Sequence, residues 1–208
     1  MAVETRNDIL DAADALFGTL GFEAATTREI AEASGANKAL IHYHFGGKEG
    51  LLDGVLDRYY TRLTGVMAVA LSGEGDVRTK LHRLVDTYID FLGENPNFFR
   101  IVQREAAGGP RKDRIVERMS SILGLGMPAI RAAFPATIAG PLAAEHLVVS
   151  FYGAIITYFS YAKVLEGLLD EDPLSPYKIS ERKVHLHWLL DSTLDALART
   201  DAGHAGGA

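Results

Sequence analysis

The segment that most constrains the fold is residues 26–52, which read TTREIAEASGANKALIHYHFGGKEGLL. It reads as two short helices separated by a tight break at Ser34-Gly35, with the second helix starting near Asn37. This spacing is typical of a helix-turn-helix, a motif whose second helix lies in the major groove of DNA. No acidic residue falls between Ala36 and Lys48, so the second helix is locally basic.

The second helix carries residue types that suit DNA. Residues at its N-terminal end meet base edges, where Lys can donate to guanine and small apolar groups can contact thymine methyls. Aromatic, His and Lys side chains further along suit phosphates, as do free backbone N–H groups at the start of the preceding helix. The predicted DNA-binding residues are Thr26, Thr27, Asn37, Lys38, Ala39, His42, Tyr43, His44 and Lys48. A helical hairpin with a merely solvated polar face is the alternative.

A longer series of positions surrounds this motif: Gly21-Phe22, Thr26-Thr27, Ile30-Ala31, Gly35, Lys38-Ala39, His42-Tyr43-His44-Phe45, Lys48-Glu49 and Leu51-Leu52. In order and spacing these positions resemble the N-terminal part of the tetracycline-repressor (TetR) family over roughly residues 5–60. Two positions depart from the family pattern, Ala25 where Thr is common and His42 where Tyr is common. The resemblance implies a DNA-binding head and a larger helical part that dimerises and often holds a ligand.

Apolar residues recur at helical spacing along the whole chain, and no window alternates as a strand would. The sequence therefore predicts an all-α protein with a three-helix DNA-binding domain at 1–50, a helical effector-binding and dimerisation domain at 51–200, and a disordered tail at 201–208. Within the larger domain we expect one helix at 112–134 with an interruption at 124–128, one at 142–169, and a last helix from Ser180 to about Arg199.

The larger domain also has many aromatic and Met side chains at helical spacing. Glycines and a proline at 124–128 would loosen helix packing, which favours a cavity for a small hydrophobic ligand. The predicted ligand-binding residues are Tyr88, Phe91, Phe99, Met119, Leu123, Met127, Phe151, Tyr152, Ile155 and Phe159. Such side chains also form ordinary protein cores, and that alternative stays open.

Two helices favour a homodimer. The segment 142–169 is apolar around most of its circumference, and the last helix carries a broad apolar surface that includes Trp188 and Leu189. Two such helices meeting their two-fold mates would form a four-helix interface, so Trp188 and Leu189 are predicted interface residues. A purely intrachain core is the alternative. The apolar run at 146–162 is too short to span a bilayer comfortably, and no membrane partner is expected.

Composition narrows the remaining classes. The chain has no Cys, which excludes disulfides and thiolate metal sites and suits a cytoplasmic protein. The His pairs at 42/44 and 185/187 point apart on a helix, so no metal site is predicted. No nucleophile elbow or phosphate-binding loop is present, and neither an enzyme nor a cofactor is expected.

These observations predict a sequence-specific transcriptional regulator that binds a double-stranded DNA operator, a repressor released by a small-molecule effector. The alternative is a helical ligand-binding or interaction protein with a vestigial DNA-binding domain. Charge motivates the alternative: the net charge is −6, and residues 1–65 hold six Lys and Arg against ten Asp and Glu. DNA-binding surfaces are usually basic, so the first hypothesis requires those acids to face away from DNA.

Overall fold

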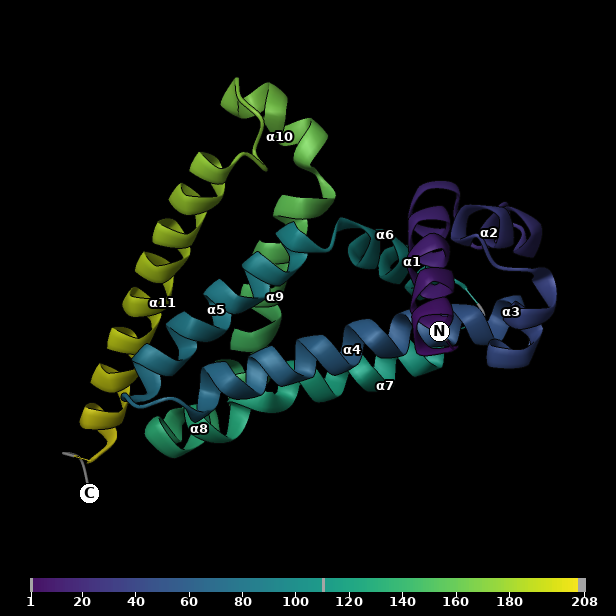
Figure 1. Cartoon of the computed structure of the whole chain (residues 1–208). Coiled ribbons are helices and arrows are strands. Elements are labelled where there is room, and N and C mark those ends of the chain that lie inside the picture. Colours follow the sequence, from purple (N-terminus) through teal and green to yellow (C-terminus); the bar gives the residue numbers. More distant parts are fainter. Residues whose placement is uncertain (1, 110, 206–208) are drawn as a thin grey trace. The chain divides into compact units, whose positions relative to one another are not determined.

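The computed structural model describes residues 2–109 and 111–205 (Figure 1). Every regular element in these ranges is a helix, which confirms the predicted all-α class. The elements are α1 (Ala2–Leu20), α2 (Thr27–Ser34), α3 (Lys38–Phe45), α4 (Lys48–Ser72), α5 (Val77–Glu94), α6 (Pro96–Ala106), α7 (Lys112–Leu123), η1 (Gly124–Gly126), α8 (Met127–Ala133), η2 (Pro135–Thr137), η3 (Gly140–Leu142), α9 (Ala144–Ser160), α10 (Ala162–Leu169) and α11 (Pro176–Ala205).

The chain forms two compact units. The first, here called the head unit, comprises residues 1–64 and 94–118, and the second, the body unit, comprises residues 65–93 and 119–208. The boundary at residues 64 and 65 falls inside α4, so a helix and not a loop joins the units at that point. This division differs from the predicted one at residue 50, because α4 begins at Lys48 and contributes residues to both units.

The core of the head unit holds the helix-turn-helix in place. Ile9 and Phe17 of α1, Ile30 of α2 and Ile41 of α3 are almost completely buried. Burying side chains of this size stabilises a fold by roughly 1.5–3 kcal/mol each. The first helix ends at Gly21, whose φ of 87° is a conformation that favours glycine.

Helix α6 adds a segment distant in sequence to the head unit. Asn97 donates its side-chain N–H to the Asp14 carboxylate at 3.1 Å, and Arg104 donates to the carbonyl oxygen of Phe17 at 3.3 Å. Both acceptors belong to α1. The head is therefore larger than the predicted three-helix domain.

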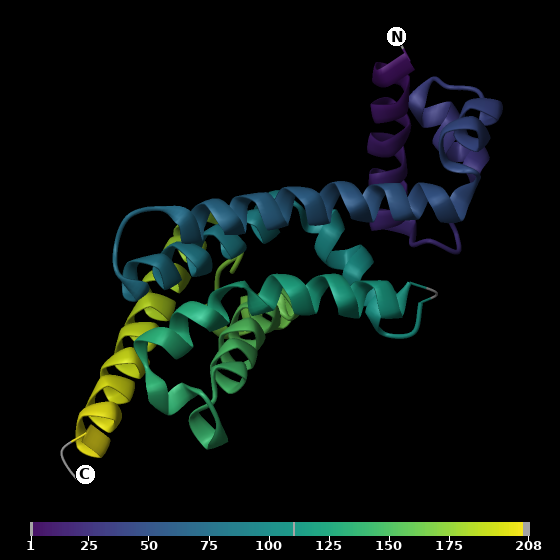
Figure 2. The ribbon, with the colours of Figure 1, turned by 90° about the horizontal axis from the view of Figure 1, so that it is seen from below.

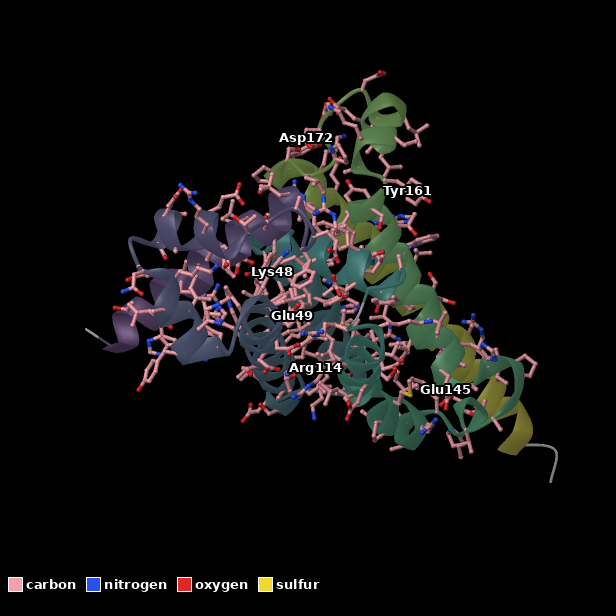
Figure 3. All side chains as sticks on the ribbon, turned by 90° about the vertical axis from the view of Figure 1, so that its right-hand side faces the viewer. Lys48, Glu49, Arg114, Glu145, Tyr161 and Asp172 are labelled. Carbon is pink, nitrogen blue, oxygen red and sulfur yellow. The ribbon has the colours of Figure 1, made fainter. Side chains whose placement is uncertain are left out.

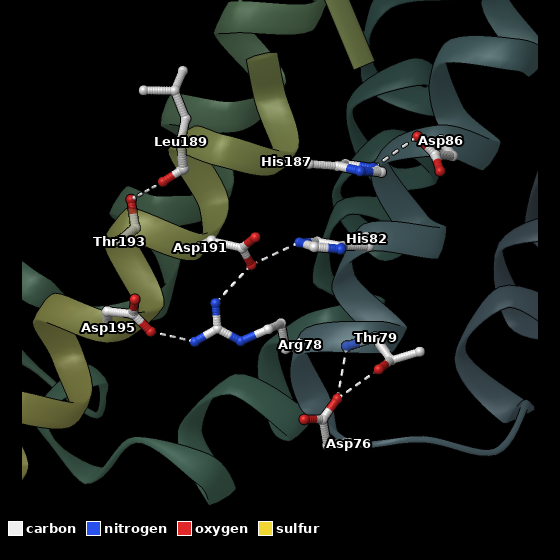
Figure 4. Close-up of polar contacts among 10 residues, drawn as sticks. All are labelled: Asp76, Arg78, Thr79, His82, Asp86, His187, Leu189, Asp191, Thr193 and Asp195. Atoms are coloured by element: carbon white, nitrogen blue, oxygen red, sulfur yellow. Dashed lines mark hydrogen bonds and ion pairs between the residues drawn. The ribbon is translucent and has the colours of Figure 1, made fainter. Parts of the chain in front are cut away.

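In the body unit, α5 and α11 meet along a polar seam (Figure 4). Arg78 of α5 donates to Asp191 of α11 at 2.6 Å, and Asp191 also contacts His82 Nε2 at 2.9 Å. The rings of His82 and His187 stack with centroids 4.2 Å apart, and His187 Nε2 lies 2.9 Å from Asp86. Burial opposes ionisation of Asp191, but hydrogen bonds and charge from Arg78 and His82 outweigh it and hold its pKa below the usual value.

The predicted interruption between residues 124 and 128 is confirmed, because the 3₁₀ turn η1 separates α7 from α8 and the ribbon changes direction there (Figure 2). The predicted continuous helix at 142–169 is wrong. It breaks at Tyr161, labelled in Figure 3, whose φ of −107° and ψ of 22° are not helical, so α9 and α10 are separate helices.

The predicted start of the last helix at Ser180 is also wrong. Helix α11 begins at Pro176, and the Ser175 hydroxyl accepts a hydrogen bond from the Lys178 N–H at 3.3 Å. Proline suits the first helical position because it lacks the N–H that would otherwise be unpaired there. The helix runs to Ala205, which corrects the predicted disordered tail over 201–205, whereas 206–208 lie outside the described residues.

Candidate nucleic-acid interface and ligand cavity

The turn between α2 and α3 is fixed by local hydrogen bonds. The Thr26 hydroxyl accepts from the Glu29 N–H at 3.2 Å, and the Glu29 carboxylate accepts from the Thr26 N–H at 2.9 Å, which completes a capping box. Hydrogen bonds from the hydroxyl and the backbone of Thr26 lower the pKa of Glu29. At the other end, Gly35 has a φ of 66° and donates to the Ala31 carbonyl oxygen.

Helix α3 presents one face to solvent because its opposite face is anchored. Ile41 is fully buried, and the Asn37 side-chain oxygen caps the helix by accepting from the Leu40 N–H at 3.1 Å. At about 100° per residue, the positions two before and two after Ile41 point away from it. The exposed residues, here called the reading face, are Lys38, Ala39, His42 and Tyr43.

The reading face has the properties that base recognition requires. Tyr43 is 81% exposed, and α3 contains no acidic residue. Asn37 was predicted to contact bases. Its side-chain oxygen accepts the capping hydrogen bond, so its amide N–H₂ is the group that can donate to a partner outside the helix. The protruding side chains of α3 are therefore basic, aromatic or small.

The predicted phosphate contacts lie around the rim of this face. Thr26 is exposed and Thr27 half-buried at the start of α2, and the ring of His44 packs against Tyr43 with centroids 5.0 Å apart. Lys48, at the start of α4 in Figure 3, is half-buried and donates to the Glu23 carbonyl oxygen at 3.1 Å. An ammonium group has three N–H donors, so two remain available to an anion.

Two acidic residues of α1, Asp11 and Asp14, contact other helices of the head unit. Asp11 forms an ion pair with Arg58 of α4. Asp14 accepts hydrogen bonds from the Tyr59 hydroxyl at 2.6 Å and from Asn97. Burial and then the Asp14 contact raise the pKa of Tyr59, so its hydroxyl stays protonated and donating.

Two acidic residues of α4, Asp53 and Asp57, are paired with arginines. Asp53 contacts Arg111 at 2.7 Å and Arg114 at 2.9 Å, and Asp57 contacts Arg114 at 2.6 Å (Figure 3 labels Arg114). Residues 94–118 bring these arginines, so the whole head unit holds twelve Lys and Arg against fourteen Asp and Glu. Residues 94–118 therefore reduce the acidic excess of the head unit, and α3 itself carries no acidic residue.

The body unit contains a cavity of about 110 Å³. Its lining is almost entirely aliphatic and aromatic and comes from six α-helices and the turn η1. The lining residues are Met67, Leu81, Leu84, Val85, Tyr88, Ile122, Leu123, Leu125, Gly126, Ile130, Leu147, Val148, Phe151, Tyr152, Ile155, Leu190, Thr193 and Leu194. Of the ten predicted ligand-binding residues, the structure brings together five here: Tyr88, Leu123, Phe151, Tyr152 and Ile155.

The other five predicted residues do not line this cavity. Phe91 and Met119 are buried but do not line the cavity. On α5, the last residue that lines the cavity is Tyr88, one turn before Phe91. Met127 and Phe159 are half-buried beyond the lining, and Phe99 belongs to the head unit. The leucines of α5 and the lining residues of α11 were not predicted from the sequence. Their spacing of three and four residues was a usable signal for a shared helix face.

An apolar surface is left exposed on α9 and α11. Trp188 is 62% exposed and Val184, one turn earlier on the same face, is 67% exposed, whereas Leu189 is half-buried. On α9, Val149 is 65% exposed. The helical stretch Gly140–Ser160 is apolar and long enough to cross a membrane by length and composition alone, yet only 22% of its most apolar window is buried. These helices have apolar surface that this single chain does not cover.

The fold and the head define a two-unit, all-helical protein with a capped helix-turn-helix. Residues 9–55 match the family described as bacterial regulatory proteins, tetR family. This match assigns residues 9–55, which lie within the head unit, to that family.

Two curated relatives illustrate the sequence match. The chain is 31% identical over 99 residues to the HTH-type transcriptional activator FasR of Mycolicibacterium smegmatis, covering 48% of this chain and 45% of that protein. It is 31% identical over 100 residues to the HTH-type transcriptional repressor KstR2 of Rhodococcus jostii, covering 48% and 49%. The chain thus spans about half the length of the curated relatives it matches.

Solved structures match over more of the chain. A putative fatty acid metabolism regulator of Clostridium perfringens has a TM-score of 0.73 at 20% identity, covering 88% of this chain and 96% of that one. The ketosteroid transcriptional regulator KstR2 of Mycobacterium tuberculosis has a TM-score of 0.68 at 18% identity, covering 90% and 93%. At these identities the likeness shows the shared fold.

Proposed function

We propose that this protein is a sequence-specific, DNA-binding transcriptional regulator, a cytoplasmic repressor that a small hydrophobic ligand releases from its operator. The observation that carries the proposal is the reading face: an exposed, acid-free surface on a capped α3, anchored from behind by the fully buried Ile41. A recognition helix must be both rigid and uncovered to enter the major groove.

Each part of the interface has a role in this proposal. Lys38 donates to guanine O6 and N7, and the Ala39 methyl contacts a thymine methyl. His42 reads a neighbouring base edge. Tyr43, together with Thr26 and Thr27 at the start of α2, holds phosphates and so sets the register of α3 on the duplex.

The operator follows from symmetry. We propose a homodimer formed through the exposed apolar surface of α9 and α11, with Trp188 and Leu189 in the interface. Two copies of the reading face related by a two-fold axis require two half-sites in inverted orientation. The DNA partner is therefore a pseudo-palindrome.

Release requires a ligand that binds the DNA-incompetent state better than the competent one. The body cavity is the proposed site, and α4, which belongs to both units, is the proposed connection. The almost entirely aliphatic and aromatic lining of this cavity supports an apolar ligand class. Coupling in such systems is typically about 1–3 kcal/mol, or roughly a 5- to 150-fold loss of operator affinity.

The alternative of a vestigial DNA-binding domain rested on the acidic balance of residues 1–65. The ion pairs of Asp11, Asp53 and Asp57 offset part of that balance, and α3 carries no acidic residue. No other observation favours this alternative.

The test is selection of DNA fragments by the purified protein, followed by binding measurements on variants. We expect an inverted repeat, and we expect Lys38→Ala to lose roughly 1–3 kcal/mol at one base pair per half-site. Lys163→Ala, an exposed lysine on α10, is the matched control and should bind like the wild type. Selected fragments without an inverted repeat would contradict the proposal.

A further inference from the structure

The lining of the body cavity restricts the electrical charge of whatever fills it. None of its lining side chains is Lys, Arg, His, Asp or Glu. A carboxylate moved from water into such surroundings loses its hydration and gains no counter-ion, which is strongly unfavourable. The buried part of a ligand must therefore be uncharged.

The cavity lining nevertheless includes a few polar groups, all of them hydroxyls. Three lining side chains carry a hydroxyl: Tyr88, Tyr152 and Thr193. The Thr193 hydroxyl is used, since it donates to the Leu189 carbonyl oxygen at 2.8 Å (Figure 4). The two tyrosine rings lie 6.2 Å apart between centroids and their hydroxyls are hydrogen-bonded to each other. Burial raises the pKa of Tyr152, against a smaller opposing effect of that bond, so the Tyr152 hydroxyl stays protonated.

The size of the cavity sets a second restriction. A protein cavity of about 150 Å³ lined by aliphatic and aromatic side chains holds benzene. The present cavity, at about 110 Å³, accepts a group of similar order, a single ring or a short branched chain. Gly126 contributes to this space because it has no side chain.

One candidate counter-ion, Arg182, is already engaged by other groups. Arg182 of α11 is half-buried, donates to the Ala154 carbonyl oxygen at 2.9 Å and lies over the Tyr158 ring at 5.1 Å. Ala154 directly precedes the lining residue Ile155, but Arg182 itself does not line the cavity. Its Nε has no hydrogen-bond partner in the described part of the chain, which makes Arg182 the residue to test against our inference.

Resting on the proposed function, we infer that the effector site takes an uncharged, ring-sized apolar group carrying one hydrogen-bonding oxygen at Tyr88 and Tyr152, and that it rejects carboxylates. The ligand oxygen takes the place of the Tyr88–Tyr152 bond and pairs with both tyrosine hydroxyls, so no buried hydroxyl is left unpaired. The hydrocarbon part fills the space between α5, α9 and α11.

Three probes of nearly equal size separate the requirements: toluene, benzyl alcohol and benzoate, titrated into the full-length protein by calorimetry at neutral pH. We expect benzyl alcohol to bind most tightly, toluene more weakly, and benzoate at least about tenfold more weakly than benzyl alcohol. Tyr152→Phe keeps the ring and should weaken benzyl alcohol by about 2- to 12-fold while leaving toluene unchanged.

The inference is overturned if benzoate binds as tightly as benzyl alcohol, and loss of that binding in Arg182→Gln would assign the carboxylate to Arg182. It is also overturned if none of the probes binds at millimolar concentration, or if Tyr152→Phe weakens toluene as much as benzyl alcohol. Operator affinity, measured separately with each probe, distinguishes the two proposals. If benzyl alcohol binds without weakening the operator complex, only the proposed ligand release is contradicted. If benzoate binds and releases DNA, only the inference that the site rejects carboxylates is contradicted.

Discussion

Thr26 is the residue on which the geometry of α2 most depends, because it is both N-cap and capping-box partner. Thr26→Ala should lower the free energy of unfolding by about 0.5–2 kcal/mol, the usual effect of losing an N-cap hydroxyl. Thr26→Ser keeps the hydroxyl and should remain near the wild type. Chemical denaturation of both variants measures the difference, and equal loss in the two would remove the capping role.

Glu29 gives the same cap a pH dependence. Its pKa is lowered from the usual 4.5, so its contribution to stability is present above pH 4.5 and is lost as pH falls through the lower, folded-state value. Glu29→Gln should therefore flatten the fall in the free energy of unfolding below pH 4.5. In a Thr26→Ala background the same change should matter less, since the hydroxyl is the main cause of the shift. An unaltered acid limb in Glu29→Gln would contradict this.

Lys48 has two roles that one variant can separate. If its spare N–H groups hold a phosphate, Lys48→Ala should reduce the slope of log affinity against log salt by about one unit. Loss of the bond to Glu23 should also lower the melting temperature modestly. A lowered melting temperature with an unchanged salt slope would leave Lys48 as a structural residue only.

Local sequence was enough to predict the turn at Gly35, because its hydrogen bonds reach only three or four residues back along the chain. The acceptor of Lys48 is 25 residues earlier in the chain, and the arginines that neutralise Asp53 and Asp57 follow them by more than 50 residues. No short-range pattern carries such information. The reading face was predictable, and its charge environment was not.

At the scale of elements, the turn η1 shapes the cavity, and its two glycines differ. A Cβ at Gly126 would lie 3.2 Å from Leu84 Cδ1, whereas a Cβ at Gly124 would meet nothing within 4 Å. Gly126→Ala should therefore weaken benzyl alcohol roughly tenfold or more, and Gly124→Ala should leave its affinity unchanged. Both changes alter backbone freedom alike, so the difference reports on cavity space. Equal affinities would place the ligand elsewhere.

The elements that the sequence misjudged share a cause. The spacing of apolar residues at 142–169 continues unchanged across the break at Tyr161. Such spacing indicates which face of a helix is apolar, but it does not show where the backbone dihedral angles of one residue become non-helical. Half of the predicted ligand-binding residues do not line the cavity, because composition does not show which face of a helix borders a cavity. Only packing among α5, α9 and α11 decides that.

At the scale of the whole molecule, the exposed apolar surface predicts assembly. Val184 is 67% exposed in one chain, so Val184→Glu should leave the protomer folded but place an unpaired charge in the dimer interface and dissociate it. Val69→Glu, at a position 71% exposed on α4, is the matched control. Sedimentation at micromolar concentration checks both. A Val184→Glu protein that remains dimeric would exclude this face of α11.

The head unit consists of two separate segments of the sequence, 1–64 and 94–118, and residues 65–93 between them belong to the body unit. An engineer who grafts only the first piece onto another regulator's body would leave Arg62 without Asn95, and Asp53 without Arg111. Natural recombination faces the same obstacle, because a single crossover near residue 64 separates partners that fold together. New DNA specificities on this scaffold are therefore easier to reach by substitution on α3 than by exchange of whole segments.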